Sequence, residues 1–398
     1  MKNTDDDGPV FEFGDQDYGS AVGWQPWGPT EAEKEDAPPD MLYARPASEW
    51  LAGALETPPS PTLFGPFWRM DELAILFATT GVGKSVLALQ IAEALARGLA
   101  IEPFAAPPRP ERVLYLDFEL DSTQFAMRYS RIDPGEMRYD TPYQFSPDLI
   151  RAELYWDGRI LDGYTGFSDM FFQNISDKLD EHEATVLIVD NITFLDRTST
   201  TNVNTALSIM RALSAIKRQK LVSILVLAHT SKRIRPKPLT EADLQGSINL
   251  ANFADSIFAM GPSSRAPALR YLKQIKTRSG RMVHDRDHVP IFSLEKFDAA
   301  RAFGIAQDTD RAPVENFLGM KFVKFDCEDE HISESPVRAR KVAASVERKD
   351  RITVKAKDML ANGKSTREIA KKLQIPRTTI IRYLKERKSL KNEHLQEQ

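Results

Sequence analysis

Short continuous runs of apolar residues alternate with helical or irregular polar segments between residues 73 and 276. Such runs of about 4–8 residues are typical of parallel strands, because helices cover both faces of their sheet. The pattern predicts strands over residues 73–78, 113–118, 185–189, 222–228, 256–260 and 269–276. We therefore expect an α/β domain over residues 41–298, built on a mostly parallel sheet.

The two ends of the chain depart from this pattern. Residues 1–40 are rich in Asp, Glu, Gly and Pro without periodicity, which predicts a disordered acidic head. Within the head, Trp24 and Trp27 are either a candidate docking motif or a segment without function that lies on a neighbouring surface. Residues 299–345 are irregular and charged, and predict a linker. Helical periodicity returns over residues 346–390, which predict a small all-α domain.

Charge is distributed unevenly along the 398 residues, although the formal net charge is only −4. Residues 1–40 hold eleven acids and two bases, whereas residues 336–398 hold eighteen bases and seven acids. We therefore expect nucleic-acid contact driven by net charge at the C-terminus. The single cysteine, Cys327, excludes a disulfide framework and fits a cytoplasmic setting. No apolar run approaches the roughly 20 residues of a membrane-spanning helix, so no membrane partner is expected.

The most specific motif directly follows the first predicted strand. Residues 78–85 read Ala-Thr-Thr-Gly-Val-Gly-Lys-Ser, and a helical pattern begins at Val86. In a P-loop, glycines let backbone amides face the phosphates, the lysine reaches the β/γ-phosphates, and the hydroxyl ligates Mg²⁺. The motif predicts that ATP and Mg²⁺ are bound, with Ala78 standing where the strict motif has glycine. The residues expected around the nucleotide are Thr79, Thr80, Gly81, Val82, Gly83, Lys84, Ser85 and Val86.

Two acids at strand ends complete a candidate hydrolysis site. Asp190 ends the apolar run Val-Leu-Ile-Val and is, with Ser85, the expected Mg²⁺ residue. Glu119 follows the strand over residues 113–118 and is the candidate base that activates water. Because ligands bind at the carboxyl ends of parallel strands, both positions suit catalysis. A solvent-facing acid at residue 119 is the alternative.

These motifs resemble the RecA-like ATPases, and more narrowly the RepA-type plasmid helicases and their DnaB-like relatives, over residues 45–298. The resemblance implies that His229 senses the γ-phosphate, although Ala228 replaces the first histidine of the family's pair. It also implies that Lys276 and Arg278 reach the ATP of a neighbouring subunit, so the protein would be a homo-oligomer, as a hexameric ring or a filament. A structural histidine and two solvated strand-end bases are the alternatives.

A basic stretch follows the fourth predicted strand. It contains Lys232, Arg233, Arg235 and Lys237. In RecA-like proteins the similar loop faces the central channel and tracks single-stranded DNA, as a basic groove does without reading sequence. A mobile surface loop remains the alternative. His284 and His288 are four residues apart, a spacing that suits zinc only on a helix, and no metal site is expected there.

The basic tail carries the pattern of a helix-turn-helix. A helix over residues 351–360 precedes a capping box at Ser365 to Glu368, which opens a second helix, and residues 377–384 form a third. Residues 365–384 resemble the C-terminal domains of resolvases and invertases. The side chains expected to face DNA are Arg377, Thr378, Thr379 and Arg382. A three-helix interaction module without DNA contact is the alternative.

Together these features favour a DNA-dependent ATPase of a plasmid, phage or other mobile element. The resemblance implies a replicative helicase or motor, tethered to single- or double-stranded DNA by its tail. Two other functions stay open. One is a site-specific DNA-binding regulator whose assembly ATP controls, and the other is a RecA-like recombination accessory that forms filaments.

Overall fold

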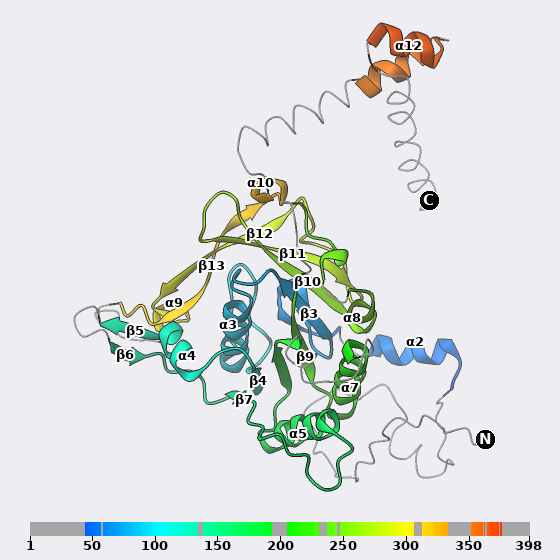
Figure 1. The fold of residues 1–398 in the computed structure, drawn as a ribbon. Helices are drawn as coiled ribbons and strands as arrows, with labels where there is room; N and C mark the ends of the chain where they lie inside the picture. Colours follow the sequence, from blue (N-terminus) through cyan, green and yellow to red (C-terminus); the bar gives the residue numbers. More distant parts are fainter. Residues whose placement is uncertain are drawn as a thin grey trace. The chain divides into compact units, whose positions relative to one another are not determined.

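The computed structural model describes residues 44–56, 59–133, 138–192, 205–230, 237–244, 247–305, 313–332, 352–360, 362, 364–373 and 375. The chain divides into two compact units, Met1–Glu328 and Asp329–Gln398. Figure 1 shows the fold, coloured along the sequence. None of the helices in these ranges combines the length and the apolar character needed to cross a membrane.

A nine-stranded sheet forms the centre of the first unit's described residues, in the order β13-β12-β11-β10-β3-β9-β8-β4-β7 (Figure 1). The strands from β10 to β7 are mutually parallel, and β11, β12 and β13 join antiparallel. The predicted α/β fold with a mostly parallel sheet is therefore confirmed. The sheet strands are β3 (Leu73–Ala78), β4 (Val113–Asp117), β7 (Leu149–Glu153), β8 (Val186–Asp190), β9 (Ser223–His229), β10 (Ser256–Pro262), β11 (Leu269–Thr277), β12 (Val289–Phe297) and β13 (Phe317–Asp326).

Helices cover both faces of the parallel strands, as their unbroken burial requires. β3, β4 and β8 are buried at every position. The connection from β3 through α3 (Lys84–Arg97) to β4 crosses the sheet in the opposite direction to the later connections from β7 to β8, from β8 to β9 and from β9 to β10, so right-handed crossovers place α3 on one face. The other face carries α5 (Phe167–Glu181), α7 (Thr205–Lys220) and α8 (Ser247–Phe253).

Shorter elements surround this core. They are α2 (Ala47–Glu56), the pair β1 (Thr62–Phe64) and β2 (Trp68–Arg69) joined by the 3₁₀ turn Gly65–Phe67, α4 (Ser122–Tyr129), the hairpin β5 (Ser130–Asp133) and β6 (Arg138–Pro142), a second 3₁₀ turn at Glu241–Asp243, and α9 (Ala299–Ala302). The body therefore extends beyond the motif-bearing strands at both ends.

Part of the predicted linker is a strand of the sheet. β13 pairs with β12 along its whole length, with Phe297 opposite Phe317 and Val289 opposite Asp326. The prediction of a linker was wrong over residues 317–326 because the charged residues of β13, among them Lys321 and Lys324, suggested an irregular segment. An edge strand leaves one face to solvent, and β13 is buried only near its start.

β13 is bound directly to the helix that follows the P-loop. The Gln90 amide on α3 donates to the Met320 carbonyl at 2.9 Å, and the Met320 N–H donates to Gln90 Oε1 at 2.7 Å. Both residues are buried, so this reciprocal pair satisfies polar groups that would otherwise be costly. The late antiparallel strands thereby support the nucleotide-binding helix.

The second unit contains α10 (Asp329–Ile332), a helix over residues 352–360, and α12 (Thr366–Leu373). Ala356 and Ile369 are fully buried where the last two helices pack. The predicted capping box forms, since the Ser365 N–H donates to Glu368 Oε2 at 2.7 Å. The third helix of the predicted helix-turn-helix, with Arg377, Thr378, Thr379 and Arg382, lies outside the described residues.

Candidate active site

The P-loop joins β3 to α3 in the predicted order. Gly83 precedes the first residue of α3 with a φ of 106°, and Gly81 has a φ of 80°. Because L side chains rarely adopt such angles, both positions favour glycine. Ala78 ends β3 fully buried, next to His229 and Met260 in the sheet register. A small side chain therefore fits at the position where the strict motif has glycine.

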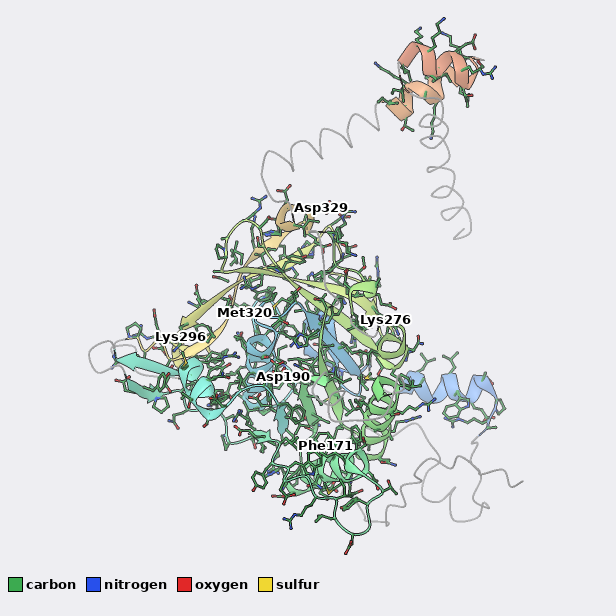
Figure 2. The ribbon with its side chains drawn as sticks, viewed as in Figure 1. Phe171, Asp190, Lys276, Lys296, Met320 and Asp329 are labelled. Atoms are coloured by element: carbon green, nitrogen blue, oxygen red, sulfur yellow. The ribbon has the colours of Figure 1, made fainter. Side chains whose placement is uncertain are left out.

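Lys84, the first residue of α3, lies beside Asp190, which ends β8 and is labelled in Figure 2. Lys84 Nζ lies 3.9 Å from Asp190 Oδ1, and both side chains are almost completely buried. Burial raises the pKa of Asp190, while Lys84 and the Ser85 hydroxyl act in the opposite direction. A lysine held beside a buried carboxylate is placed to exchange this partner for a phosphate.

The two oxygens of the Asp190 carboxylate have different surroundings. Tyr115 donates a hydrogen bond to Asp190 Oδ2 at 2.8 Å. The other oxygen, Oδ1, is buried without a hydrogen-bond partner among the described residues. A buried orphan oxygen beside a serine hydroxyl suits Mg²⁺, which prefers hard oxygen ligands. Ser85 and Asp190 thus fit the metal that the P-loop motif implies.

Asp117 ends β4 and Glu119 comes two residues later, and the two acids have different tasks. Asp117 Oδ1 accepts hydrogen bonds from the backbone N–H of Glu119 at 3.1 Å and of Leu120 at 3.0 Å. Its other oxygen accepts from Arg151 Nε at 2.9 Å. With both oxygens engaged, Asp117 shapes the turn, and this turn directs Glu119 toward the site.

Glu119 meets Asn191 and His229 at the edge of the sheet. The Asn191 amide donates to Glu119 Oε1, and His229 Nε2 lies 3.5 Å from the same oxygen. The contact with His229 lowers the pKa of Glu119, against burial, which raises it. Glu119 is therefore a carboxylate at neutral pH, as a general base must be.

His229 links this cluster to the phosphate loop. β9 lies between β3 and β8, and the register sets His229 opposite Ala78. His229 Nδ1 lies 3.4 Å from Thr80 Oγ1, and Thr230 Oγ1 donates to Thr79 Oγ1 at 3.1 Å. Parallel pairing thus brings the predicted sensor to the loop that would hold the γ-phosphate.

Sequence reasoning missed two residues of this site. Asn191 binds Glu119, and its place directly after Asp190 at a strand end was the available signal. Arg270 on β11 donates from Nε to the Val82 carbonyl of the P-loop at 2.5 Å. Burial lowers the pKa of Arg270. No sequence pattern marks Arg270, because only the antiparallel pairing of β11 with β10 brings it to the loop.

Lys276 and Arg278 do not join the site of their own chain. Lys276 pairs with Ile257 in the register, and Arg278 N–H donates to the Asp255 carbonyl, so both lie at the level where β3 begins. Lys276 Nζ donates to the Ala251 carbonyl on α8 at 2.7 Å (Figure 2). Since the P-loop follows the other end of β3, about 10 Å of strand separates Lys276 from it and about 16 Å separates Arg278.

The predicted DNA-contacting loop is described only at its end. Lys232, Arg233 and Arg235 lie outside the described residues. Lys237 is about half exposed and forms an ion pair with Asp243 at 3.1 Å. The loop is anchored just beyond, where the Leu239 N–H donates to Glu328 at 2.7 Å.

His284 and His288 belong to an aromatic stack. The His284 ring stacks on Phe67 and on Phe325, with centroid distances of 5.4 Å in each case, and the two histidine rings lie 5.3 Å apart. His284 Nδ1 lies 3.1 Å from the His288 carbonyl oxygen, and burial lowers the pKa of His284. These contacts assign the pair a packing role.

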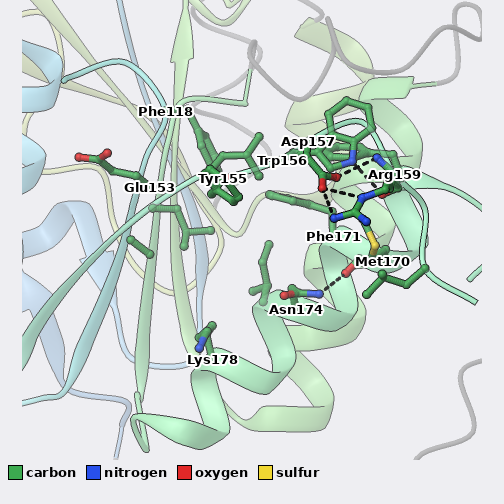
Figure 3. Close-up of a pocket in the computed structure, with 16 residues that line it drawn as sticks. Phe118, Glu153, Tyr155, Trp156, Asp157, Arg159, Met170, Phe171, Asn174 and Lys178 are labelled. Atoms are coloured by element: carbon green, nitrogen blue, oxygen red, sulfur yellow. Dashed lines mark hydrogen bonds and ion pairs between the residues drawn. The ribbon is translucent and has the colours of Figure 1, made fainter.

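A cavity of about 390 Å³ lies on the α5 side of the same strand ends (Figure 3). Phe118, which precedes the candidate base, lines it together with Trp156 and Phe171. Asp157 and Arg159 on its rim bind each other. The P-loop does not contribute to its lining, so this cavity is separate from the nucleotide site.

Part of the chain is similar to a known family of domains. Residues 39–234, just under half of the chain, match the family model described as an AAA domain. Among solved structures, a KaiC-like protein from the hyperthermophilic archaeon Pyrococcus horikoshii OT3 is similar at 12% identity and a TM-score of 0.42, over 60% of this chain and 95% of that chain. No curated protein matches the sequence.

The strand order, the P-loop, the acids at the ends of β4 and β8 and the similarity of residues 39–234 to the AAA domain support a P-loop ATPase domain. The site brings a lysine, a buried aspartate and an ionised glutamate together at the carboxyl ends of the parallel strands, and nucleotide hydrolysis uses side chains of these kinds.

Proposed function

We propose that the protein is a DNA-dependent ATPase motor that works as a homo-oligomer, with the unwinding role of a replicative helicase. The observation that carries the proposal is the position of Lys276 and Arg278 at the end of β11 remote from their own P-loop. Arginines that stabilise the charge of phosphoryl transfer can be supplied in trans. Arg278 is about half exposed and forms an ion pair with Asp255 at 3.2 Å, a partner that it would exchange for the nucleotide of a neighbouring subunit.

Hydrolysis would use the residues at the edge of the sheet. Glu119 takes the proton of the attacking water, and Asn191 and His229 orient its carboxylate. Lys84 and the N-terminus of α3 stabilise the phosphates. Mg²⁺, held by Ser85 and Asp190, would offset the charge that develops on the transferring group. Arg270 keeps the loop in shape through the Val82 carbonyl.

DNA binding is proposed at two places. The basic loop with Lys232, Arg233 and Arg235 follows directly after His229 and Thr230, so a change at the γ-phosphate has a short path to it. The tail supplies the second place, supported by its capping box, its packed helices and its net positive charge.

One set of measurements tests this function. ATP hydrolysis is measured alone, with single strands and with duplex, followed by unwinding of a forked substrate, with Lys84→Ala as the inactive reference. We expect single strands to stimulate hydrolysis and the fork to be unwound. Hydrolysis by Lys84→Ala at the full rate would overturn the nucleotide site itself.

Subunit mixing tests the neighbour's arginine. Arg278→Ala and Glu119→Gln chains are each expected to be nearly inactive alone. Mixed together, they should recover part of the activity, because a Glu119→Gln subunit donates Arg278 to a neighbour with an intact Glu119. Failure to recover any activity in mixtures shown to co-assemble would contradict action in trans.

A second candidate function is an ATP-controlled regulator that binds a specific duplex, in line with the packed helices of the tail. It predicts stimulation by one duplex sequence and no unwinding. Deleting residues 350–398 would then abolish stimulation, whereas the motor without its tail should still respond to single strands.

A further inference from the structure

Tyr115 lies within the nucleotide site, four residues before the candidate base Glu119. It is the third residue of β4, with 2% of its surface exposed. Its hydroxyl donates to Asp190 Oδ2 at 2.8 Å and lies 3.5 Å from the Ser85 carbonyl oxygen. Phenylalanine would fill the same apolar position in the strand, so packing alone does not account for the hydroxyl.

The hydroxyl determines how the Asp190 carboxylate is turned. The terminal torsion of an aspartate is soft, so a buried carboxylate without a fixed partner rotates. With Oδ2 bound to Tyr115, Oδ1 is left facing Lys84 at 3.9 Å, a distance at the outer limit of an ion pair. Oδ1 has no hydrogen-bond partner among the described residues and is the atom available to a metal ion.

Without the hydrogen bond from Tyr115, the Asp190 carboxylate is free to turn both oxygens toward Lys84, where it would compete with the phosphate.

We propose that Tyr115 is a positioning residue for Mg²⁺: it holds Asp190 so that Oδ1 faces the metal and Lys84 stays available to the nucleotide. The proposal rests on the nucleotide site and not on DNA binding or oligomerisation. It assigns a role to a residue of β4 that lies outside the P-loop and is neither Glu119 nor Asp190.

The chain offers a closely matched control. Tyr129 is also a buried tyrosine of the same unit, 3% exposed, but its hydroxyl has no hydrogen-bond partner among the described residues. Tyr115→Phe and Tyr129→Phe each remove one buried oxygen. Only the first removes a bond to Asp190.

The test measures metal binding rather than turnover. Binding of a fluorescent ATP analogue is titrated with Mg²⁺ at equilibrium, and Mn²⁺ binding is followed by electron paramagnetic resonance. For Tyr115→Phe we expect the Mg²⁺ concentration at half-saturation to rise about tenfold, the effect of one hydrogen bond to a charged group. Binding of the analogue in EDTA should change less than about twofold, and Tyr129→Phe should match the wild type.

A double-mutant cycle tests whether the effect of Tyr115 on metal binding depends on Asp190. If Tyr115 acts through Asp190, Tyr115→Phe should have almost no further effect on Mn²⁺ binding in an Asp190→Asn background. Equal half-saturation for Tyr115→Phe and Tyr129→Phe, or additive effects in the cycle, would overturn the proposal. Loss of analogue binding in EDTA by the wild type itself would instead count against the nucleotide site.

Discussion

Asn191 directly follows β8, and His229 ends the neighbouring parallel strand β9. Their side chains meet, with Asn191 Nδ2 3.1 Å from His229 Nε2. The same amide binds Glu119, so one side chain joins the candidate base to the candidate sensor. Asn191 is buried and directly follows the last residue of β8. The base is thereby oriented by a buried residue next to a strand of the sheet.

Removing this amide should weaken catalysis more than nucleotide binding. We expect Asn191→Ala to lower kcat about tenfold, as a misplaced general base does, with ATP affinity within about twofold of the wild type. Steady-state kinetics and equilibrium binding of an ATP analogue measure the two effects. Asn174→Ala is the control, because the Asn174 amide binds the Met170 carbonyl within α5. Equal losses in the two variants would show that Asn191 has no special role.

Replacing the base should separate hydrolysis from binding. Glu119→Gln keeps the shape but cannot accept a proton, and we expect hydrolysis to fall about 10²–10⁴-fold while ATP still binds. Glu153→Gln serves as control, because Glu153 is the acid opposite Asp117 at the end of the neighbouring strand. Retention of more than about a tenth of the wild-type rate by Glu119→Gln would exclude Glu119 as the base.

The acid limb of the pH profile should depend on His229. The contact with His229 is the main cause that lowers the pKa of Glu119 below its ordinary 4.5. A general base works above its pKa, so activity is lost as the pH falls through that value. His229→Ala should raise the pKa of Glu119 and move the acid limb of kcat/KM to higher pH. A limb that stays in place would show that another group controls it.

Gly83 should tolerate alanine poorly for two reasons that a control can separate. Its φ of 106° strains an L residue, and an added Cβ would lie 2.9 Å from Met320 Cε. Gly158 has a similar φ of 89° but open space around it. We expect Gly158→Ala to cost about 1 kcal/mol in the free energy of unfolding, and Gly83→Ala about 2–4 kcal/mol. Denaturant unfolding measures both, and equal costs would contradict the role of the contact with Met320.

Much of the site was predictable because its residues lie beside strand ends that apolar runs reveal. Lys84, Glu119, Asp190 and His229 each follow or end such a run, and parallel pairing brings the ends of neighbouring strands together. Arg270 was not predictable, since it reaches the P-loop only through the antiparallel turn of β11. Asn191 and Tyr115 are close in sequence to predicted site residues, but their roles depend on partners far along the chain.

By itself, the sequence determined the local elements: the buried strands, the P-loop and its helix, and the capping box of the tail. These depend on interactions between residues close in the chain, such as apolar periodicity, glycine conformation and helix caps. The tertiary structure alone decided that residues 317–326 complete the sheet, that Asp117 shapes a turn while Glu119 faces the site, and that Lys276 and Arg278 lie away from their own nucleotide. Each of these outcomes depends on strand order and register, which arise from packing between segments distant in sequence.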